Sequence, residues 1–243
     1  MTFEASAEVY DRHVGRYGPR LAAALIEAAG VASGSRALDV GCGPGVLTRV
    51  LAELLGPTRV AAVDPSEPFV EACRERVPGA DVRLAAAEEL PYADGEFDSV
   101  LAQLVVNFMA DPEAGVAEMR RVARPGAAVA ACVWDYPGEM TMLRAFWDAA
   151  LELDPTAPDE GRTMRFCRPG ELAGLWQRCG LADVEDGALV VEAAYEDFDD
   201  YWAPFPAGVA PSGAYCASLD PARREALREA CFRRSARRRG RSA

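Results

Sequence analysis

The chain has 243 residues, enough for one large domain or two small ones, and it carries a formal net charge of -12. Half of its residues are hydrophobic and 26% are charged, a balance that excludes global disorder and is typical of a protein with a full core. No run of about 18 apolar residues is free of charge, so we expect no membrane span. The first residues also lack the apolar segment of a signal peptide.

All the basic residues are arginine, and nine of the 26 lie within residues 223–243. The rest of the chain is therefore strongly acidic. Because contacts to phosphate need a basic surface, we expect no nucleic-acid partner. We expect residues 233–243 to form a disordered basic tail, because so many arginines with few apolar neighbours cannot bury enough surface to become ordered.

Seven cysteines and one histidine limit the chemistry that is available to the chain. The cysteine number is odd and no two have Cys-x-x-Cys spacing, so we expect no disulfide framework, no metal site and a reducing cytoplasmic location. His13 alone has an ordinary pKa near neutrality, which makes it the candidate general base. An exposed helical histidine is the alternative interpretation of the same residue.

The first half of the chain alternates helix-like and strand-like segments with short connections. This order predicts an α/β fold, a doubly wound and mostly parallel sheet with helices on both faces. The expected strands cover residues 36–40, 59–63, 81–85, 97–106 and 127–134, and the expected helices begin near Pro19, Pro44, Ser66 and Asp111.

The regular alternation of helix-like and strand-like segments ends after Trp134. We expect residues 1–232 to form one domain, with its core over about 35–135 and its substrate-side helices and lid over about 136–220. The later segments are expected to be a helix over 143–151, a polar loop over 154–168, a helix over 169–179, a strand over 189–194, an aromatic loop or lid over 201–215, and a last helix from Asp220.

The motif LDVGCGPG, Leu38–Gly45, joins an expected strand to an expected helix. Glycines at positions 41, 43 and 45 let the backbone turn sharply and approach a ligand closely. The N-terminus of the next helix presents free N–H groups that suit an anionic group. Asp64 lies at the tip of the next strand, where doubly wound folds place the carboxylate that binds ribose hydroxyls. The motif therefore predicts a nucleotide-type site at the carboxyl edge of the sheet.

Two kinds of cofactor compete for this site. A dinucleotide site needs G-x-G-x-x-G/A, and here the last of these positions is Val46. The spacing is G-x-G-x-G instead, and a nucleotide-dependent oxidoreductase is accordingly the less favoured alternative. A regulatory protein that binds the cofactor without catalysis would use the same glycines and the same Asp64.

The glycine motif, Asp64, the segment LPYADGEFD and Arg124-Pro125-Gly126 occur in an order that resembles the class I S-adenosylmethionine (SAM) dependent methyltransferases. Residues 35–135 are similar to the methyltransferase type 11 group, small-molecule methyltransferases related to quinone-biosynthesis enzymes. The resemblance implies methyl transfer from SAM to a small-molecule acceptor, with S-adenosylhomocysteine as the product. In that family a further strand usually follows the last helix, and no strand pattern is present here, so we expect the last strand to be missing.

The resemblance also implies roles for individual residues. Asp39 and the segment Gly41, Cys42, Gly43 and Gly45 would surround the methionine end of SAM, and Gln103 would face the same end or the reaction centre. Asp64 would bind the ribose, and the adenine would lie among Pro65, Ser66, Ala87 and Glu88. The chain departs from the family at Ala86, where an acid usually meets the adenine amino group.

The acceptor side is marked by aromatic residues, which often line small-molecule pockets. Candidates are Tyr10, His13 and Tyr17 near the N-terminus, Trp134, Asp135 and Tyr136 after the fifth strand, and the segment YWAPF at 201–205. Hydrophobic core is the alternative interpretation for each aromatic residue. The sequence identifies neither the acceptor atom nor the oligomeric state.

Overall fold

The computed structural model describes residues 16–208 and 210–239, and the chain divides into two compact units. The first unit comprises the chain as far as Val133 together with Pro169–Glu192. The second comprises Trp134–Arg168 and the chain from Ala193 onward. The structure thus differs from the single domain expected over residues 1–232, although the first division falls close to the expected end of the regular alternation.

The first unit is built around five parallel strands in the order β3-β2-β1-β4-β5, which confirms the predicted doubly wound sheet. Strands β1 and β2 are buried along their whole length, which explains why they are apolar apart from Asp39 and Asp64. The order reverses between β1 and β4, and ligands of such sheets bind at the carboxyl ends of the strands near this point. The strands are β1 (Ala37–Val40), β2 (Val60–Asp64), β3 (Asp81–Leu84), β4 (Phe97–Gln103) and β5 (Ala123–Cys132).

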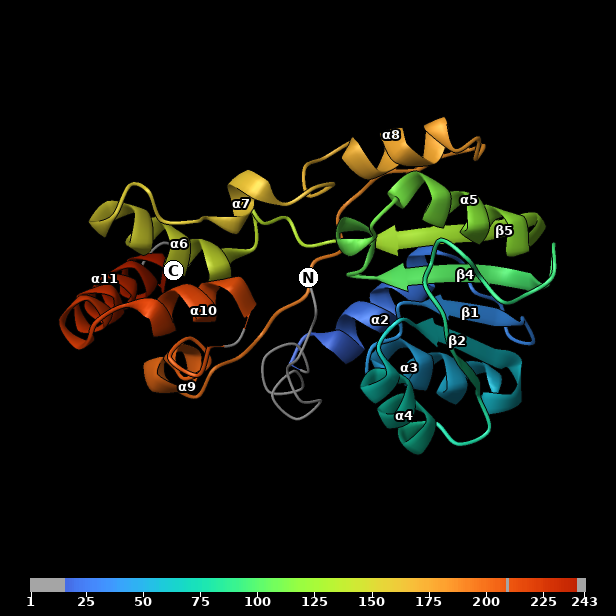
Figure 1. Cartoon of the computed structure of the whole chain (residues 1–243), viewed down its shortest axis with the longest axis horizontal. Coiled ribbons are helices and arrows are strands. Elements are labelled where there is room, and N and C mark those ends of the chain that lie inside the picture. The colour runs from blue at the N-terminus through green and yellow to red at the C-terminus, as the bar shows by residue number, and fades with distance from the viewer. Residues whose placement is uncertain (1–15, 209, 240–243) are drawn as a thin grey trace. The chain divides into compact units, whose positions relative to one another are not determined.

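Helices cover this sheet on both faces (Figure 1). Helices α3 and α4 contact β1, β2 and β3, and α2 packs on α3. Helix α5 contacts β4 and β5, and α8 packs on α5. The helices of this unit are α2 (Gly18–Ala28), α3 (Val46–Leu55), α4 (Glu67–Arg76), α5 (Pro112–Val122) and α8 (Glu171–Arg178), with short 3₁₀ turns η1 (Pro57–Arg59) and η2 (Val106–Phe108).

The residues before α5 and α4 were both expected to cap these helices, and only the first of them does so. Asp111 accepts a hydrogen bond from the Ala114 N–H at 3.1 Å and Pro112 occupies the first turn of α5, as the sequence predicts. Ser66 precedes α4, but its side chain makes no capping bond. Its backbone N–H donates to Asp64 Oδ1 at 2.9 Å instead, so this position contributes to the carboxyl end of β2.

The segment LPYADGEFD is fastened to α5 by one arginine. Arg121 forms ion pairs with Glu118 and Asp94, and its guanidinium also donates to the carbonyls of Leu90 and Tyr92. Glu118 in turn accepts the Leu90 N–H at 2.9 Å. The loop that precedes β4 is therefore held in one conformation.

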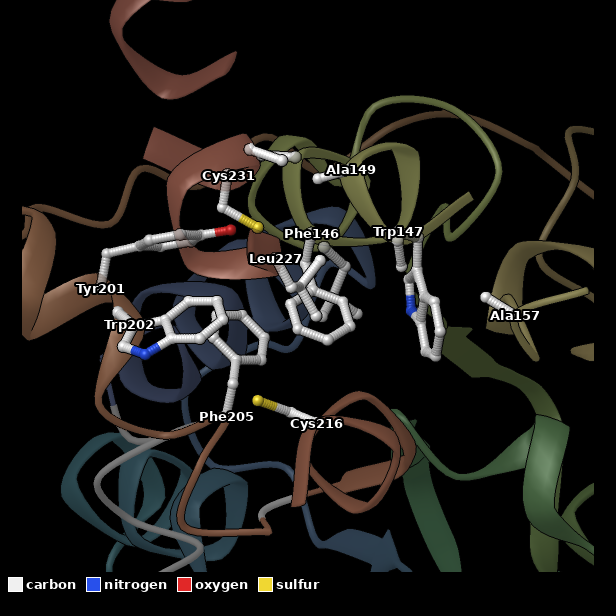
Figure 2. Packing of buried hydrophobic residues seen from close by; sticks show 14 of the residues in the cluster. Phe146, Trp147, Ala149, Ala157, Tyr201, Trp202, Phe205, Cys216, Leu227 and Cys231 are labelled. Carbon is white, nitrogen blue, oxygen red and sulfur yellow. The ribbon is translucent and has the colours of Figure 1, made fainter. Parts of the chain in front are cut away.

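The second unit is helical and has an aromatic core (Figure 2). Phe146 stacks on Phe205 with ring centroids 4.4 Å apart, and Trp147 meets Phe146 edge-on at 5.1 Å. Tyr201 and Trp202 belong to the same buried cluster. Its helices are α6 (Thr141–Leu153), α7 (Glu160–Thr163), α9 (Phe198–Trp202), α10 (Ala210–Ser218) and α11 (Pro221–Arg239).

This core corrects the expectation of an aromatic loop or lid over 201–215. The segment contains most of α10 and the end of α9, and Phe205 is fully buried. Proline and glycine in this segment suggested a loop, whereas burial of its aromatic rings against α6 stabilises two short helices. The polar loop expected over 154–168 likewise contains α7.

A buried polar network lies beside this core. The Arg144 guanidinium donates to Asp159 Oδ1 at 2.7 Å and to Asp148 Oδ1 at 2.6 Å. The Trp147 indole donates to Glu160 Oε2 at 2.8 Å. These bonds attach α7 and the residue before it to α6, and each of the four carboxylate and indole groups gains a partner.

The strand expected over 189–194 has no ladder partner among the described residues. Strand β5 is thus an edge of the sheet, and α8 covers part of it. The Trp176 indole on α8 donates to the Val129 carbonyl at 2.7 Å and so satisfies one acceptor of this strand. The absence of a strand at this edge agrees with the departure from the family noted in the sequence.

Helix α11 continues to Arg239, so the structure differs from a tail that is disordered from residue 233. Arg234 donates to Glu152 at 2.9 Å and lies 3.8 Å from Asp148, both on α6. These acids give the arginine partners that sequence composition could not reveal. Among the described residues, no helix has the length and apolar character that a membrane crossing requires.

Candidate functional site

The glycine loop between β1 and α3 is anchored on β2. The N–H groups of Gly41 and Cys42 both donate to the Val63 carbonyl, at 2.8 and 2.9 Å. A side chain at Gly41 would lie 2.5 Å from the methyl groups of Val105, which follows β4. Gly43 has a φ of +52° and no protein atom within 4 Å of the position a Cβ would take. The loop is therefore packed at Gly41 and open at Gly43.

Asp64 ends β2 beside this loop. Its Oδ2 accepts the Gly43 N–H and its Oδ1 accepts the Ser66 N–H, both at 2.9 Å. Burial raises the pKa of this carboxyl, and the two backbone bonds oppose that rise. Each carboxylate oxygen has a second lone pair, so Asp64 can hold the loop and still accept hydrogen bonds from a ligand.

Asp39 on β1 is 1% exposed and has only one satisfied oxygen. The Thr48 hydroxyl on α3 donates to its Oδ2 at 2.7 Å, while Oδ1 is buried and has no hydrogen-bond partner among the described residues. Burial raises the pKa of Asp39 to about 7; the Thr48 bond lowers it, and the charge of Asp64 raises it further. A buried acceptor of this kind costs free energy unless a ligand supplies the donor.

Gln103 ends β4, the strand that pairs with β1. Its side-chain nitrogen donates to the Gly18 carbonyl at 3.4 Å, and its Oε1 is a second buried oxygen for which residues 16–208 and 210–239 supply no partner. In the ladder Asp39 lies beside Leu101, two residues before Gln103. Two unsatisfied acceptors thus lie at the carboxyl ends of adjacent strands.

Two thiols lie beneath the loop. The Cys42 thiol donates to the Gly43 carbonyl at 3.4 Å, and the Cys73 thiol donates to the Thr48 hydroxyl at 3.7 Å. The interaction of the two neighbouring thiols, together with burial, raises the pKa of Cys42, and the same interaction lowers that of Cys73. A side chain at Gly45 would lie 2.8 Å from the Cys73 sulfur, so the third glycine is required by close packing on α4.

The residues expected around the adenine lie on both sides of the end of β2. Pro65 and Ser66 follow Asp64 directly, and the Ala85 N–H donates to the Asp64 carbonyl at 3.1 Å, which brings the segment leading to Ala87 alongside. Ala87 is buried. Glu88 Oε1 accepts the Asp111 N–H at 3.1 Å, so this acid fastens the segment to the start of α5.

The residues expected on the acceptor side belong to different units or lie outside the described residues. Tyr10 and His13 lie outside the described residues, and Tyr17 is buried in the first unit. Trp134 and Tyr136 belong to the second unit, where Tyr136 is part of the aromatic core and Trp134 packs against it. Asp135 accepts backbone N–H groups from residues 138 and 139 and shapes its own turn.

Sequence reasoning missed Thr48. It is fully buried on α3, where the neighbouring buried positions Leu47 and Leu51 are apolar. A hydroxyl on the apolar face of a helix needs a partner, and the carboxylate of Asp39, nine residues earlier, was the available acceptor. That pattern is the signal that could have revealed the pair.

Known proteins similar to this chain point to one family. The family model described as "Methyltransferase domain" matches residues 38–131. An uncharacterized methyltransferase of Schizosaccharomyces pombe is 30% identical over 149 residues, which cover 54% of this chain and 53% of that protein. A ubiquinone/menaquinone biosynthesis C-methyltransferase of Cupriavidus taiwanensis is 37% identical over 109 residues, 43% of this chain and 45% of that protein. The chain thus spans about half the length of these curated relatives.

Solved structures agree in fold. A putative methyltransferase from an antibiotic biosynthesis pathway of Anabaena variabilis has a TM-score of 0.61 and 19% identity, covering 88% of this chain and 84% of that one. A putative methyltransferase solved with its Trm112 activator from Haloferax volcanii has a TM-score of 0.59 and 21% identity, covering 76% and 77%. The matched residues 38–131 contain the glycine loop, Asp64 and the LPYADGEFD segment on a sheet of this fold, and this part of the chain is similar to the methyltransferase domain family.

Proposed function

We propose that the chain is a SAM-dependent methyltransferase that acts on a small molecule. The observation that carries the proposal is the pair of buried, unpartnered acceptors, Asp39 Oδ1 and Gln103 Oε1, within a methyltransferase domain. SAM supplies a methyl group on a sulfonium, and its methionine end carries an ammonium group with three donors. Two acceptors without donors match that ammonium in charge and in hydrogen-bonding sense.

The other residues of the site fit the rest of the cofactor. Asp64 keeps lone pairs for two ribose hydroxyls while its backbone bonds hold it in place. The open space at Gly43 allows a ligand to approach the backbone closely. Pro65, Ser66, Ala87 and Glu88 would lie beside the adenine. Glu88, already engaged with Asp111, would contribute its second oxygen at most.

For methyl transfer, the protein mainly has to bind the methyl donor and the acceptor and to align them. In methyl transfer the bond from carbon to sulfur breaks as the bond from carbon to the acceptor atom forms on the opposite side. Holding both partners in line supplies about 7–11 kcal/mol of such a barrier. The proposal covers transfer to an O, N or C atom of the acceptor. It also includes His13 as a general base, a residue that lies outside the described residues.

A dinucleotide-dependent oxidoreductase is disfavoured by the packing of Val46. Its Cγ1 lies 2.8 Å from the position a side chain at Gly18 would take, so its bulk joins α3 to α2. The dinucleotide fingerprint places a small residue at this position to bring the helix close to the strand. Val46 therefore favours the methyltransferase over the oxidoreductase.

Calorimetric titration with SAM, S-adenosylhomocysteine and NAD(H) tests the cofactor. We expect binding of the first two ligands, and binding of NAD(H) alone would overturn the proposal. Incubation with methyl-labelled SAM and fractionated metabolites then tests transfer. SAM binding with no label in any fraction would favour the regulatory alternative.

A matched pair of glycine variants makes the titration specific. Gly43→Ala and Gly34→Ala both place a Cβ at a positive φ with no protein atom within 4 Å, but only Gly43 lies in the loop. Each substitution should cost roughly 1–2 kcal/mol of stability because of the backbone conformation. Only Gly43→Ala should abolish SAM binding. Equal affinity in the two variants would exclude the loop from the site.

Asp64→Ala should weaken SAM binding roughly 10- to 150-fold, the effect of losing a hydrogen bond to a charged group, worth about 1.5–3 kcal/mol. Release of the Gly43 and Ser66 N–H groups adds to the loss. Titration checks the affinity, and circular dichroism checks that the variant is folded. An unchanged affinity would show that Asp64 does not bind the ribose.

Location and partners also remain proposals. All seven cysteines are free thiols, which supports a reducing cytoplasmic location. The acidic body supports a small-molecule acceptor over a nucleic acid.

A further inference from the structure

A chain of hydrogen bonds runs from Cys73 on α4 to the carboxyl group of Asp39. The Cys73 thiol donates to the Thr48 hydroxyl at 3.7 Å, and that hydroxyl donates to Asp39 Oδ2 at 2.7 Å. Thr48 and Cys73 are both fully buried, and they lie on two different helices. The network ends at Oδ1, which nothing in the described part of the chain satisfies.

The direction of these bonds is fixed by chemistry. In the ionised form, above its pKa of about 7, the Asp39 carboxylate can only accept, so the Thr48 proton points to Oδ2. The lone pairs of the hydroxyl are then left for the weak donor of Cys73. With Oδ2 occupied, the carboxylate cannot turn without breaking a short bond, and Oδ1 keeps one orientation.

We propose that Thr48 is a positioning residue for the cofactor: its hydroxyl, oriented by the Cys73 thiol, holds the carboxylate of Asp39 so that Oδ1 receives the ammonium group of SAM. This inference rests on the proposed function, because it takes SAM as the ligand. Thr48 itself does not touch the cofactor. Its contribution is to keep the charge and the direction of Asp39 in the form that binds a cation.

Thr48→Val keeps the size of the side chain and removes the donor. Because a hydrogen bond to a charged group is lost from Asp39, SAM affinity at pH 7 should fall roughly 10-fold or more. Loss of the donor also raises the pKa of Asp39 further, so the pH at which affinity reaches half its plateau should move upward. Thr48→Ser restores the donor and should return affinity and pH profile to near the original values.

The pH profile distinguishes positioning from simple support of the fold, because a merely structural change lowers affinity without moving the midpoint. Other groups that face Asp39 are Asp64 on β2, Cys42 in the loop and Cys73 on α4. The profile is therefore measured in Asp39→Asn as well. The midpoint should vanish there if it belongs to Asp39.

The thiols provide a second, independent comparison. Cys73→Ala and Cys216→Ala each remove a fully buried thiol, one in the network and one in the second unit. Cys73→Ala should weaken SAM binding roughly two- to fivefold, as expected for a weak hydrogen bond, and Cys216→Ala should not. If Thr48→Val fails to fold, this pair decides the question.

The outcomes are distinguishable from failure of the proposed function. If the unmodified chain binds neither SAM nor S-adenosylhomocysteine, the proposed function fails. If it binds SAM and Thr48→Val has the same affinity and the same midpoint, the positioning role is overturned. Equal affinities of Cys73→Ala and Cys216→Ala would overturn the part assigned to Cys73.

Discussion

In the second unit the buried carboxyl groups of Asp159 and Glu160 are hydrogen-bonded to Arg144 and to the Trp147 indole, whereas in the first unit Asp39 has one buried oxygen without a partner in the described part of the chain. Both units bury acidic side chains, and only the second unit provides partners for them within the protein. Native proteins seldom leave buried acceptors unsatisfied, and such exceptions concentrate at functional sites. The contrast separates polar groups that fasten helices together from those kept for a ligand.

The largest expected effect tests the compensated network. Arg144→Ala leaves Asp159 buried without its ion-pair partner, and removing one member of a buried pair costs about 3–5 kcal/mol. Thermal and urea unfolding should show a large loss of stability. The control is Arg223→Ala, whose exposed pair with Asp220 should contribute less than about 1 kcal/mol. If the two variants were equally stable, the buried network would not hold α7 to α6.

The next prediction tests the uncompensated carboxylate through pH. In the folded chain the pKa of Asp39 is raised to about 7, so this group holds a proton at pH values where the unfolded chain has released it. Its contribution to the free energy of unfolding therefore decreases as pH rises from about 4 to about 7, by about 1.4 kcal/mol per pH unit.

Asp39→Asn lacks this titration. Urea unfolding without cofactor, measured between pH 5 and pH 8, should show the free energy of unfolding of the unmodified chain falling relative to that of Asp39→Asn as pH rises. Groups that do not interact with Asp39 cancel in the difference between the two chains. Parallel curves would mean that Asp39 is not protonated on folding and that the contrast with Asp159 is lost.

The smallest effect is expected at the end of the second unit. A chain ending at Ser235 keeps Arg234 and its bonds to α6. Its stability should change by less than about 0.5 kcal/mol, and SAM affinity should change by less than about twofold. A gel shift at low and moderate salt compares nucleic-acid binding before and after truncation. Tight, salt-sensitive binding that disappears on truncation would assign residues 236–243 a nucleic-acid role.

Sequence predicted the sheet of the first unit well because each strand can be identified from its own local sequence. The apolar run at 60–63 indicates burial on both faces, and Asp111-Pro112 marks the start of α5. The strand expected at 189–194 failed for the opposite reason. Its residues favour extended backbone, but a ladder needs a partner strand, and none is present in the described part of the chain.

The candidate site was predictable in outline and not in its electrostatics. The glycine loop and the position of Asp64 were predictable because they belong to a sequence motif whose geometry depends on the backbone alone. That Asp39 has one satisfied oxygen and one free oxygen depends on Thr48, whose hydroxyl reaches it only after α3 packs on β1. In the second unit, prolines and glycines concealed α9 and α10, because aromatic burial rather than local propensity stabilises them (Figure 2).

The chain leaves the first unit after Val133, returns at Pro169 and leaves again after Glu192. A ribosome therefore completes all five strands before α8 has been synthesised. Until then the Val129 carbonyl on the last strand lacks the indole of Trp176, and the nascent sheet carries an uncovered edge of the kind that pairs with other chains. A proteolytic fragment ending near residue 133 would share this defect, so the first unit cannot be isolated by a single cut.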